Sequence, residues 1–243
     1  MRINDLAQYF RQISGKVSSN IYAGIQGQSN PQQLSFIRQL QKEMKVKNNL
    51  DTPLNELEVV VFDLETTGFY PEKGDRVLSI GAVKMIGSHI EDNHTFYSLV
   101  KSDLPLTSEI STLTNIHEDQ LRDAPDARDV LVQFFKYTQS HILVAHHSKH
   151  EKSFMQKMTW DLLKTRFEHR IIDTSFLIRL SDSSMKSLPL EEVCHKCGIV
   201  IKDRHHALGD AIMTAQIWSS YLKIAQKNGY SNLREVYEHL AKL

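Results

Sequence analysis

The sequence has little cysteine and no long apolar run. Only two cysteines occur in 243 residues, too few to crosslink a chain of this length, so a disulfide-rich secreted scaffold is excluded. No stretch approaches the roughly 18 apolar residues that a membrane-spanning helix needs. Residues 1–10 lack the apolar segment of a signal peptide. We therefore expect a cytoplasmic protein with no membrane partner.

The chain also lacks net charge, because 29 basic residues balance 29 acidic ones. An overall positive field that would attract nucleic acid is therefore absent, and such a partner must be held by local basic residues. Lys149, Lys152 and Arg204 are the candidates for phosphate contacts in the acidic part of the chain. Residues 1–50 carry a net charge of +5 and the remainder carries −5.

The composition, 41% apolar and 24% charged, suits one well-buried domain with an added segment. We predict a basic helical N-terminal extension and linker over residues 1–55, a main domain over 56–228 and a C-terminal helix over 229–243. Apolar residues recur at helical spacing near both ends of the extension. It is expected to pack on the domain, although a surface for a protein partner or nucleic acid is the alternative.

The pattern of the main domain changes along its length from strands to alternating helices and strands. Apolar and β-branched runs joined by turn residues predict strands near 59–62, 77–85 and 95–100. Helical spacing then alternates with short apolar runs. This order predicts an α/β fold, with a mixed sheet of an antiparallel meander followed by parallel strands and helices on both faces.

Two acids end the first buried strand. Asp63 and Glu65 occupy alternate positions, so on an extended strand they point to the same side. Two negative charges about 4 Å apart repel by about 4 kcal/mol at an effective dielectric constant near 20. Such a pair needs a cation or a raised pKa. It therefore predicts a metal site, with simple solvation of the strand end as the alternative.

A histidine and a third acid precede the last long helix. A separation of five residues turns about 140° around a helix, so His205 and Asp210 converge only if His205 lies in the preceding loop. Asp210 would then be stabilised by the helix dipole, and His205 could accept a proton. A surface capping pair is the alternative.

Three segments, 60–68, 143–151 and 205–210, resemble the motifs of the DEDDh 3′–5′ exonucleases. The likeness is greatest to the proofreading epsilon subunits of bacterial DNA polymerase III and covers about residues 58–228. It implies a ribonuclease-H-like fold and a two-metal-ion hydrolase that releases nucleoside 5′-monophosphates from single-stranded or frayed DNA ends, in proofreading or repair. An RNA-directed exonuclease of the same family is one alternative. A non-catalytic module that binds nucleic acid or a polymerase is another.

The resemblance also implies roles by position. His205 would be the base, and two Mg²⁺ ions, replaceable by Mn²⁺, would be held by four catalytic acids, Asp63, Glu65, Glu151 and Asp210. Substrate contacts would come from Leu64, Thr66, Thr67, Gly68, Ile116, His146 and Lys149. For His146, packing and hydrogen bonding at a strand end is the alternative.

The second motif departs from the family, which has aspartate where this chain has Glu151. A glutamate keeps the charge and reaches about one methylene farther, so we expect it to serve as a ligand directly or through water. Asp173 is the substitute, although we expect it to cap the helix from Thr174. Another arrangement or an inactive fold remains open. A lysine or arginine filling the cluster of acids would contradict the hydrolase hypothesis.

The two cysteines allow a competing metal site. Cys194 and Cys197, with His205 and His206, loosely suggest a zinc site. However, both cysteines follow the helical period of their segment, which favours a buried helix face that ends at Gly198. A redox pair is less favoured, because no strand precedes it in the required way.

Overall fold

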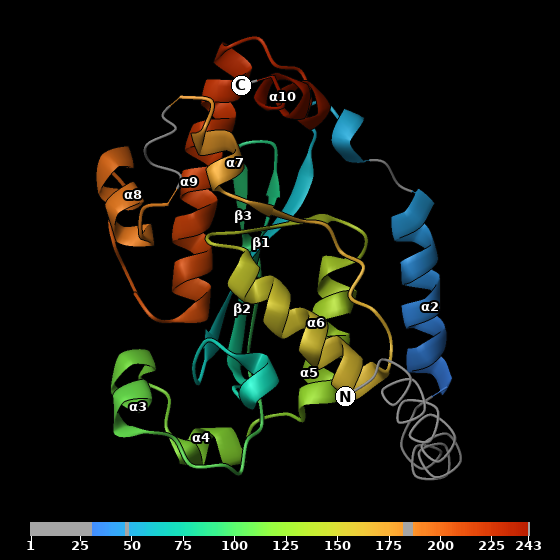
Figure 1. Cartoon of the computed structure of the whole chain (residues 1–243), viewed down its shortest axis with the longest axis vertical. Helices are drawn as coiled ribbons and strands as arrows, with labels where there is room; N and C mark the ends of the chain where they lie inside the picture. The colour runs from blue at the N-terminus through green and yellow to red at the C-terminus, as the bar shows by residue number, and fades with distance from the viewer. Residues whose placement is uncertain (1–30, 47–48, 182–186, 243) are drawn as a thin grey trace, which may run out of the picture. The chain divides into compact units, whose positions relative to one another are not determined.

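The computed structural model describes residues 31–46, 49–181 and 187–242 (Figure 1). The chain divides into two compact units, with the boundary between Gln39 and Leu40. Helix α2 (Pro31–Val46) lies where the spacing of apolar residues predicts one. The helix predicted within residues 3–13 lies outside the described ranges. The domain boundaries of the sequence analysis stay a prediction.

One five-stranded sheet organises the second unit, in the order β3-β2-β1-β4-β5. Strands β1 (Glu58–Thr66), β2 (Val77–Ile86) and β3 (His89–Leu99) form an antiparallel meander. Strands β4 (Ile142–Ala145) and β5 (Ile171–Asp173) run parallel to β1. The predicted mixed sheet is therefore confirmed, with the apolar β1 at its centre.

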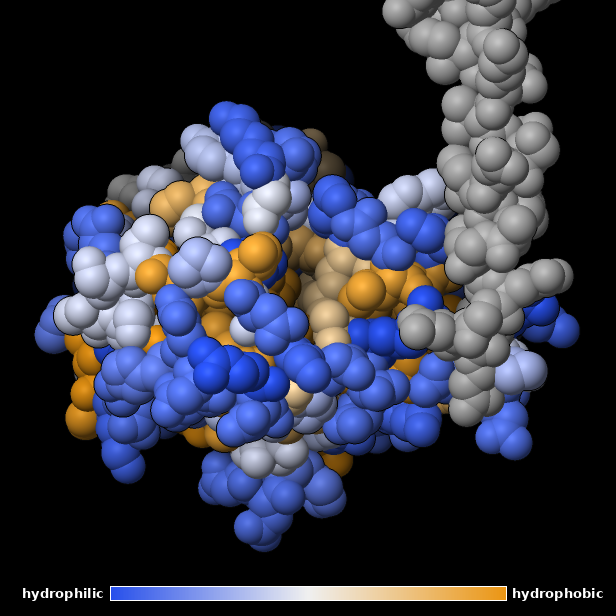
Figure 2. Space-filling view, turned by 90° about the horizontal axis from the view of Figure 1, so that it is seen from below, coloured by the Kyte–Doolittle hydropathy of each residue, from blue (hydrophilic) through white to orange (hydrophobic). Residues whose placement is uncertain are grey.

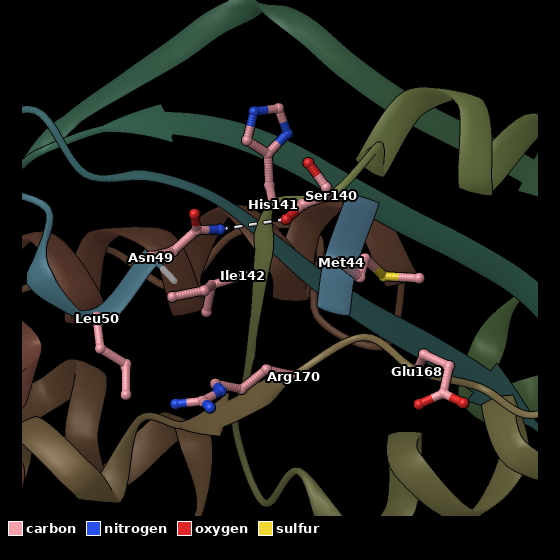
Figure 3. Close-up of a pocket in the computed structure, with 8 residues that line it drawn as sticks. All are labelled: Met44, Asn49, Leu50, Ser140, His141, Ile142, Glu168 and Arg170. Atoms are coloured by element: carbon pink, nitrogen blue, oxygen red, sulfur yellow. Dashed lines mark hydrogen bonds between the residues drawn. The ribbon is translucent and has the colours of Figure 1, made fainter. Parts of the chain in front are cut away.

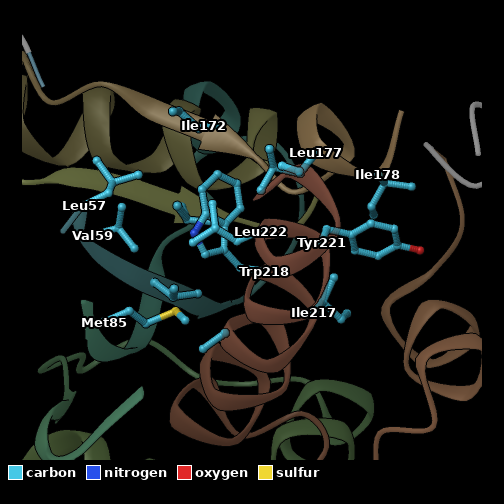
Figure 4. Packing of buried hydrophobic residues seen from close by; sticks show 14 of the residues in the cluster. Leu57, Val59, Met85, Ile172, Leu177, Ile178, Ile217, Trp218, Tyr221 and Leu222 are labelled. Carbon is cyan, nitrogen blue, oxygen red and sulfur yellow. The ribbon is translucent and has the colours of Figure 1, made fainter. Parts of the chain in front are cut away.

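The two faces of β1 pack against different helices. Val59 and Val61 belong to a buried cluster with Trp218 of α9 (Ala207–Lys227), part of which Figure 4 shows. Phe62 points to the other face, where its ring lies 5.6 Å from Phe134 of α5 (Ala127–Thr138). Since side chains alternate along a strand, Asp63 and Glu65 continue the face that α9 covers.

Most helices appear where the periodicity places them. These are α6 (Lys149–Leu163), α8 (Leu190–Cys197) and α10 (Leu233–Leu240). The predicted caps are confirmed, because Asn232 accepts a hydrogen bond from the Glu235 nitrogen and Gly198 ends α8 with φ 68°. None of the helices in the described ranges is long and apolar enough to cross a membrane. The cytoplasmic location stays a prediction.

The short helix α7 (Ser175–Ile178) lies where a helix from Thr174 is predicted. Four other short helical segments in the described ranges were not predicted, because pieces this short carry no periodic signal. They are α3 (Ser108–Thr114), α4 (Glu118–Arg122) and the 3₁₀ turns η1 (Asn49–Asp51) and η2 (Pro71–Lys73). Helices α3 and α4 lie at the lower end of the molecule in Figure 1. Figure 2, which views this end from below, shows a hollow with apolar residues inside it and polar residues around its rim.

A small cavity of about 140 Å³ lies near the start of β4 (Figure 3). The Asn49 side chain donates a hydrogen bond to the Ser140 carbonyl oxygen at 3.2 Å across this cavity. Because β1 and β4 are parallel, the cavity lies at the opposite end of the strands from Asp63 and Glu65. It is therefore separate from the candidate site.

Candidate active site

Three carboxylates meet at the end of β1. Asp63 and Glu65 come from that strand, and Asp210 comes from the first turn of α9. One oxygen of each lies within 4.8 Å of an oxygen of the other two. The first turn of α9 approaches this closely because Gly81, the β2 partner of Asp63, has no side chain to hold it off. Residues almost 150 positions apart are thus brought to one point.

His205 lies in the loop just before α9, as the convergence of His205 and Asp210 requires. Its backbone adopts φ 60°, and its backbone nitrogen donates a hydrogen bond to Asp210 Oδ2 at 3.3 Å. Burial, followed by the positive charge of Arg204, lowers the pKa of the His205 ring. The imidazole is therefore neutral near pH 7 and able to accept a proton.

Glu151 lies outside the group of three but close enough to interact with it. It occupies the first turn of α6, only 4% exposed, and its Oε2 atom accepts no hydrogen bond from the described residues. Burial of Asp63 and then the charge of Glu151 raise the pKa of Asp63 well above its usual value. Glu151 thus lies near enough to Asp63 for its charge to act on that carboxyl, and its role as a fourth ligand stays a prediction.

Asp173 is occupied elsewhere. Its Oδ1 atom accepts from the Ser175 nitrogen at 2.9 Å, and its Oδ2 atom accepts from the Ser148 nitrogen at 2.6 Å. Burial acts to raise its pKa, but these hydrogen bonds outweigh burial and lower it. Asp173 therefore orders the two chain segments that follow β4 and β5, which agrees with its predicted capping role.

The acids of the site are poorly stabilised as anions in the absence of a cation. Burial is the first cause in each case, and it raises the pKa of Glu65 to about 7, of Asp210 to about 6 and of Glu151 to about 8. Asp210 Oδ1 and Glu151 Oε2 are buried without hydrogen-bond partners among the described residues. An all-oxygen donor set of this kind fits hard divalent cations such as Mg²⁺ or Mn²⁺.

Arg204 borders this cluster. Its guanidinium donates hydrogen bonds to Glu191 Oε1 at 2.6 Å and to Asp210 Oδ2. Arg204, which is also a predicted phosphate contact, is thus held between two carboxylates. It takes one oxygen of Asp210, with no hydrogen bond to Asp63 or Glu65 in the described part of the chain, so it does not fill the cluster.

The predicted contact residues after β1 form a braced loop. The Thr66 hydroxyl donates to the Gly68 carbonyl oxygen at 2.7 Å, and the Thr67 hydroxyl donates to Asp75 Oδ1 at 3.2 Å. Gly68 itself lies so close to Asp75 that a β-carbon there would be 2.4 Å from Asp75 Oδ2. The loop therefore has a defined shape beside the carboxylates.

The other predicted contacts are divided between core and surface. The side chains of Leu64 and Ile116 are buried, and Lys149 is exposed at the start of α6. His146 uses both ring nitrogens inside the protein, at 2.7 Å from Thr174 Oγ1 and 3.0 Å from the Leu188 carbonyl oxygen. Hydrogen bonding at the strand end, the alternative for His146, is what the structure shows.

Sequence reasoning missed several aromatic residues beside the site. The Phe69 ring directly follows the first motif, is 76% exposed and meets the His150 ring edge-on at 5.7 Å. Its exposure could not be read from the sequence, although its position after Gly68 was a signal. Tyr97 and His206 stack at 4.4 Å, in a groove of about 570 Å³ that His205 also lines. This pair depends on strand register and left no sequence signal.

The cysteines do not form a metal site. Cys194 is fully buried, and burial, with a smaller contribution from Cys197, raises the pKa of its thiol to about 11. A protonated thiol is a poor nucleophile. Among the described residues, the group with metal-ligand geometry is the carboxylate set. The buried helix face is therefore the better interpretation.

Comparison with known families agrees with this geometry. A family profile described as an exonuclease family, RNase T, matches residues 60–218, which includes β1, α6 and the start of α9. The chain belongs to this exonuclease family. The resemblance to DEDDh exonucleases and to the polymerase III epsilon subunit is thereby confirmed, and the chain is a nuclease.

Curated relatives of the exonuclease include bacterial proteins named for DNA polymerase III. It is 29% identical over 194 residues to a DNA polymerase III subunit epsilon-like protein of Rhodobacter capsulatus, covering 79% of this chain and 27% of that protein. It is 33% identical over 181 residues to a PolC-type DNA polymerase III of Caldanaerobacter subterraneus subsp. tengcongensis, covering 74% of this chain and 13% of that protein. The exonuclease thus spans a small part of these relatives.

Solved structures confirm the ribonuclease-H-like fold of the exonuclease. Exonuclease I of E. coli, in complex with a dT13 oligonucleotide, has a TM-score of 0.58 at 12% identity, covering 76% of this chain and 43% of that one. The nuclease domain of 3′hExo, a DEDDh family member bound to rAMP, has a TM-score of 0.57 at 19% identity, covering 71% and 92%.

Proposed function

We propose that this exonuclease is a two-metal-ion enzyme that removes nucleoside 5′-monophosphates from the 3′ ends of single-stranded or frayed DNA. The observation that carries this proposal is the meeting of Asp63, Glu65 and Asp210 within 4.8 Å, beside His205 and at the end of a buried strand. Four acids and a base at one place suit hydrolysis of a phosphodiester.

Asp63, Glu65, Asp210 and Glu151 would hold the two Mg²⁺ ions through their carboxylate oxygens, Glu151 directly or through water. Asp63 is central in the electrostatics of the group, because burial and then the charges of Glu151, Asp210 and Glu65 raise its pKa. When bound, such ions supply a nucleophilic hydroxide near neutral pH and stabilise charge on the departing oxygen.

His205 would take the proton of the attacking water. Its lowered pKa keeps the ring unprotonated at neutral pH, which is the form that a general base needs. Its place in the loop beside Asp210, fixed by its backbone hydrogen bond, supports this assignment. Proton transfer of this kind typically contributes about 10²–10⁴-fold to a rate.

The loop after β1 would receive the terminal nucleotide. Thr66 and Gly68 form its braced backbone, and the exposed Phe69 ring offers a surface on which a base could stack. Stacking on aromatic side chains is a common way to hold single strands without reading their sequence. Lys149, exposed at the start of α6 two residues before Glu151, would contact a phosphate.

DNA is the favoured substrate because the curated relatives at 29–33% identity are DNA polymerase III proteins. RNA is the second candidate, since the 3′hExo nuclease domain was bound to rAMP. The names of the same relatives suggest a polymerase as partner, and the basic residues 1–55 are the segment we propose for contact with a polymerase or repair protein.

A nuclease assay tests the proposal. Purified protein is incubated with a 3′-labelled single-stranded DNA oligonucleotide, a matched RNA oligonucleotide and a closed circular single strand, in Mg²⁺, Mn²⁺ or EDTA. We expect ion-dependent release of labelled mononucleotides from DNA and an intact circle. The Asp63→Asn variant should be about a thousandfold slower, since metal ions supply several kcal/mol. Faster release of mononucleotides from RNA than from DNA would identify RNA as the substrate. No release from either oligonucleotide by the wild type would refute the proposal.

A further inference from the structure

Arg204 joins two acids that come from different helices. Its Nε atom donates to Glu191 Oε1 of α8, and its Nη1 atom donates to Asp210 Oδ2 of α9. The side chain of Asp210 is 3% exposed, whereas that of Glu191 is 35% exposed. The guanidinium therefore links a partly exposed anchor to a buried carboxylate of the site.

The two oxygens of Asp210 have different partners. Oδ2 accepts from Arg204 and from the His205 backbone nitrogen. Oδ1 is buried and accepts no hydrogen bond from the described residues. A carboxylate held firmly through one oxygen has a fixed orientation, so the other oxygen is presented to its surroundings in one direction. Oδ1 is thus the oxygen left for a cation.

We propose that Arg204 is a positioning residue that orients Asp210 for the metal ion, with Glu191 as its anchor. This inference rests on the proposed function of the same site. Partners of metal ligands commonly act in this way, and their loss typically costs about 10–100-fold in metal affinity or activity. The role needs an arginine, because the planar guanidinium offers two donors in fixed geometry to two carboxylates at once.

The two possible roles of Arg204 predict opposite changes in cation affinity when its side chain is removed. Removing a positive charge beside a cation site should tighten cation binding by simple electrostatics. If Arg204 instead orients Asp210, its removal frees the carboxylate to rotate and weakens binding. The direction of the change therefore distinguishes a positioning residue from a guanidinium that merely competes with the ion.

The test measures Mn²⁺ binding without nucleic acid, by electron paramagnetic resonance of free Mn²⁺, in full-length wild type, Arg204→Gln and Arg204→Lys. We expect the dissociation constant of at least one ion to rise about tenfold in both variants. Lysine keeps the charge but cannot hold Glu191 and Asp210 together. Lys202→Gln, which removes an exposed positive charge two residues away, serves as the charge control and should bind Mn²⁺ as the wild type does, or slightly more tightly.

A second measurement separates positioning from general structural damage. Nuclease activity of Arg204→Gln should recover substantially as Mn²⁺ is raised to saturation, which a misfolded site would not show. If that variant fails to fold, as judged by its melting in EDTA, Arg204→Lys decides alone. Unchanged or tighter Mn²⁺ binding in the folded variants would overturn the proposal. A wild type that binds Mn²⁺ but cleaves nothing would refute the proposed function and leave the binding result standing.

Discussion

Gly81 of β2 lies directly beneath Leu208 at the start of α9, where a β-carbon on the glycine would be 2.1 Å from the Leu208 backbone nitrogen. This contact sets the height of the helix start above the sheet. Asp210 follows Leu208 by two residues, and Asp63 is the strand partner of Gly81. The distance between Asp63 and Asp210 therefore depends on a glycine, which has no side chain, at position 81.

Replacing Gly81 should damage the site through the backbone. We expect Gly81→Ala to push α9 away, to lower the free energy of unfolding by about 1–3 kcal/mol, as overpacking typically does, and to reduce nuclease activity and Mn²⁺ affinity together. Chemical unfolding and Mn²⁺ titration measure the two effects. Wild-type stability with wild-type Mn²⁺ affinity would show that the helix start does not need this close approach.

His205 should be required for the rate rather than for metal binding. We expect His205→Ala to lower kcat by about 10²–10⁴-fold, with Mn²⁺ affinity close to that of the wild type, because its side chain is not among the proposed ligands. Steady-state kinetics on a 3′-labelled oligonucleotide provide the measurement. Equal kcat values for the two proteins would assign the base role to another group.

Glu151 tests the departure from the family motif. We expect Glu151→Asp to retain activity, since charge and oxygen donors are preserved, and Glu151→Gln to be at least about tenfold slower, as loss of one charged ligand implies. The two variants differ from the wild type by one methylene or by one charge, so each controls for the other. A large gain in Glu151→Asp would show that the longer side chain weakens the site.

Stability without metal should fall as pH rises. The raised pKa values of Glu65, about 7, and Glu151, about 8, mean that the folded protein keeps protons that the unfolded chain loses at lower pH. Each such group lowers the free energy of unfolding by up to about 1.4 kcal/mol per pH unit until its folded pKa is passed.

The window for this measurement is pH 6.5 to 8.5 in EDTA. The buried rings of His146 and His169 have pKa values lowered to about 4, chiefly by burial, and influence stability below this window. We expect the melting temperature to fall across it in the wild type and to fall less in Glu151→Gln. Added Mn²⁺ should stabilise more at pH 8.5 than at pH 6.5. A melting temperature in EDTA that stays constant or rises with pH would contradict the raised pKa values of the buried carboxylates.

Much of this site could be foreseen because its parts lie on regular elements. Asp63 and Glu65 continue the alternation of a strand, and Asp210 lies in the first turn of a helix whose periodicity is plain. The spacing of His205 to Asp210 made a loop position the condition for their convergence. The strand alternation and the helix period needed only local geometry, whereas the meeting of these residues at one site was implied by the family resemblance.

The other features of the site and fold depend on strand register and on packing between helices, which no local sequence pattern encodes. The pairing of Arg204 with Asp210 requires α8 and α9 to be placed side by side. The stack of Tyr97 on His206 requires the register of β3 against β2, which places Tyr97 opposite Gly81. The short helices α3 and α4 carry too few residues for a periodic signal, so their positions could be found only in the structure.

The central claim is that Asp63, Glu65, Glu151 and Asp210 hold divalent cations for phosphodiester hydrolysis. The most direct test is anomalous scattering from a crystal of this protein soaked in Mn²⁺, with and without a mononucleotide. The account predicts two peaks, one of them within about 2.2 Å of oxygens of Asp63, Glu65 and Asp210, and both adjacent to Asp63. A well-ordered site without any peak at these oxygens, at Mn²⁺ concentrations that support activity, would contradict it.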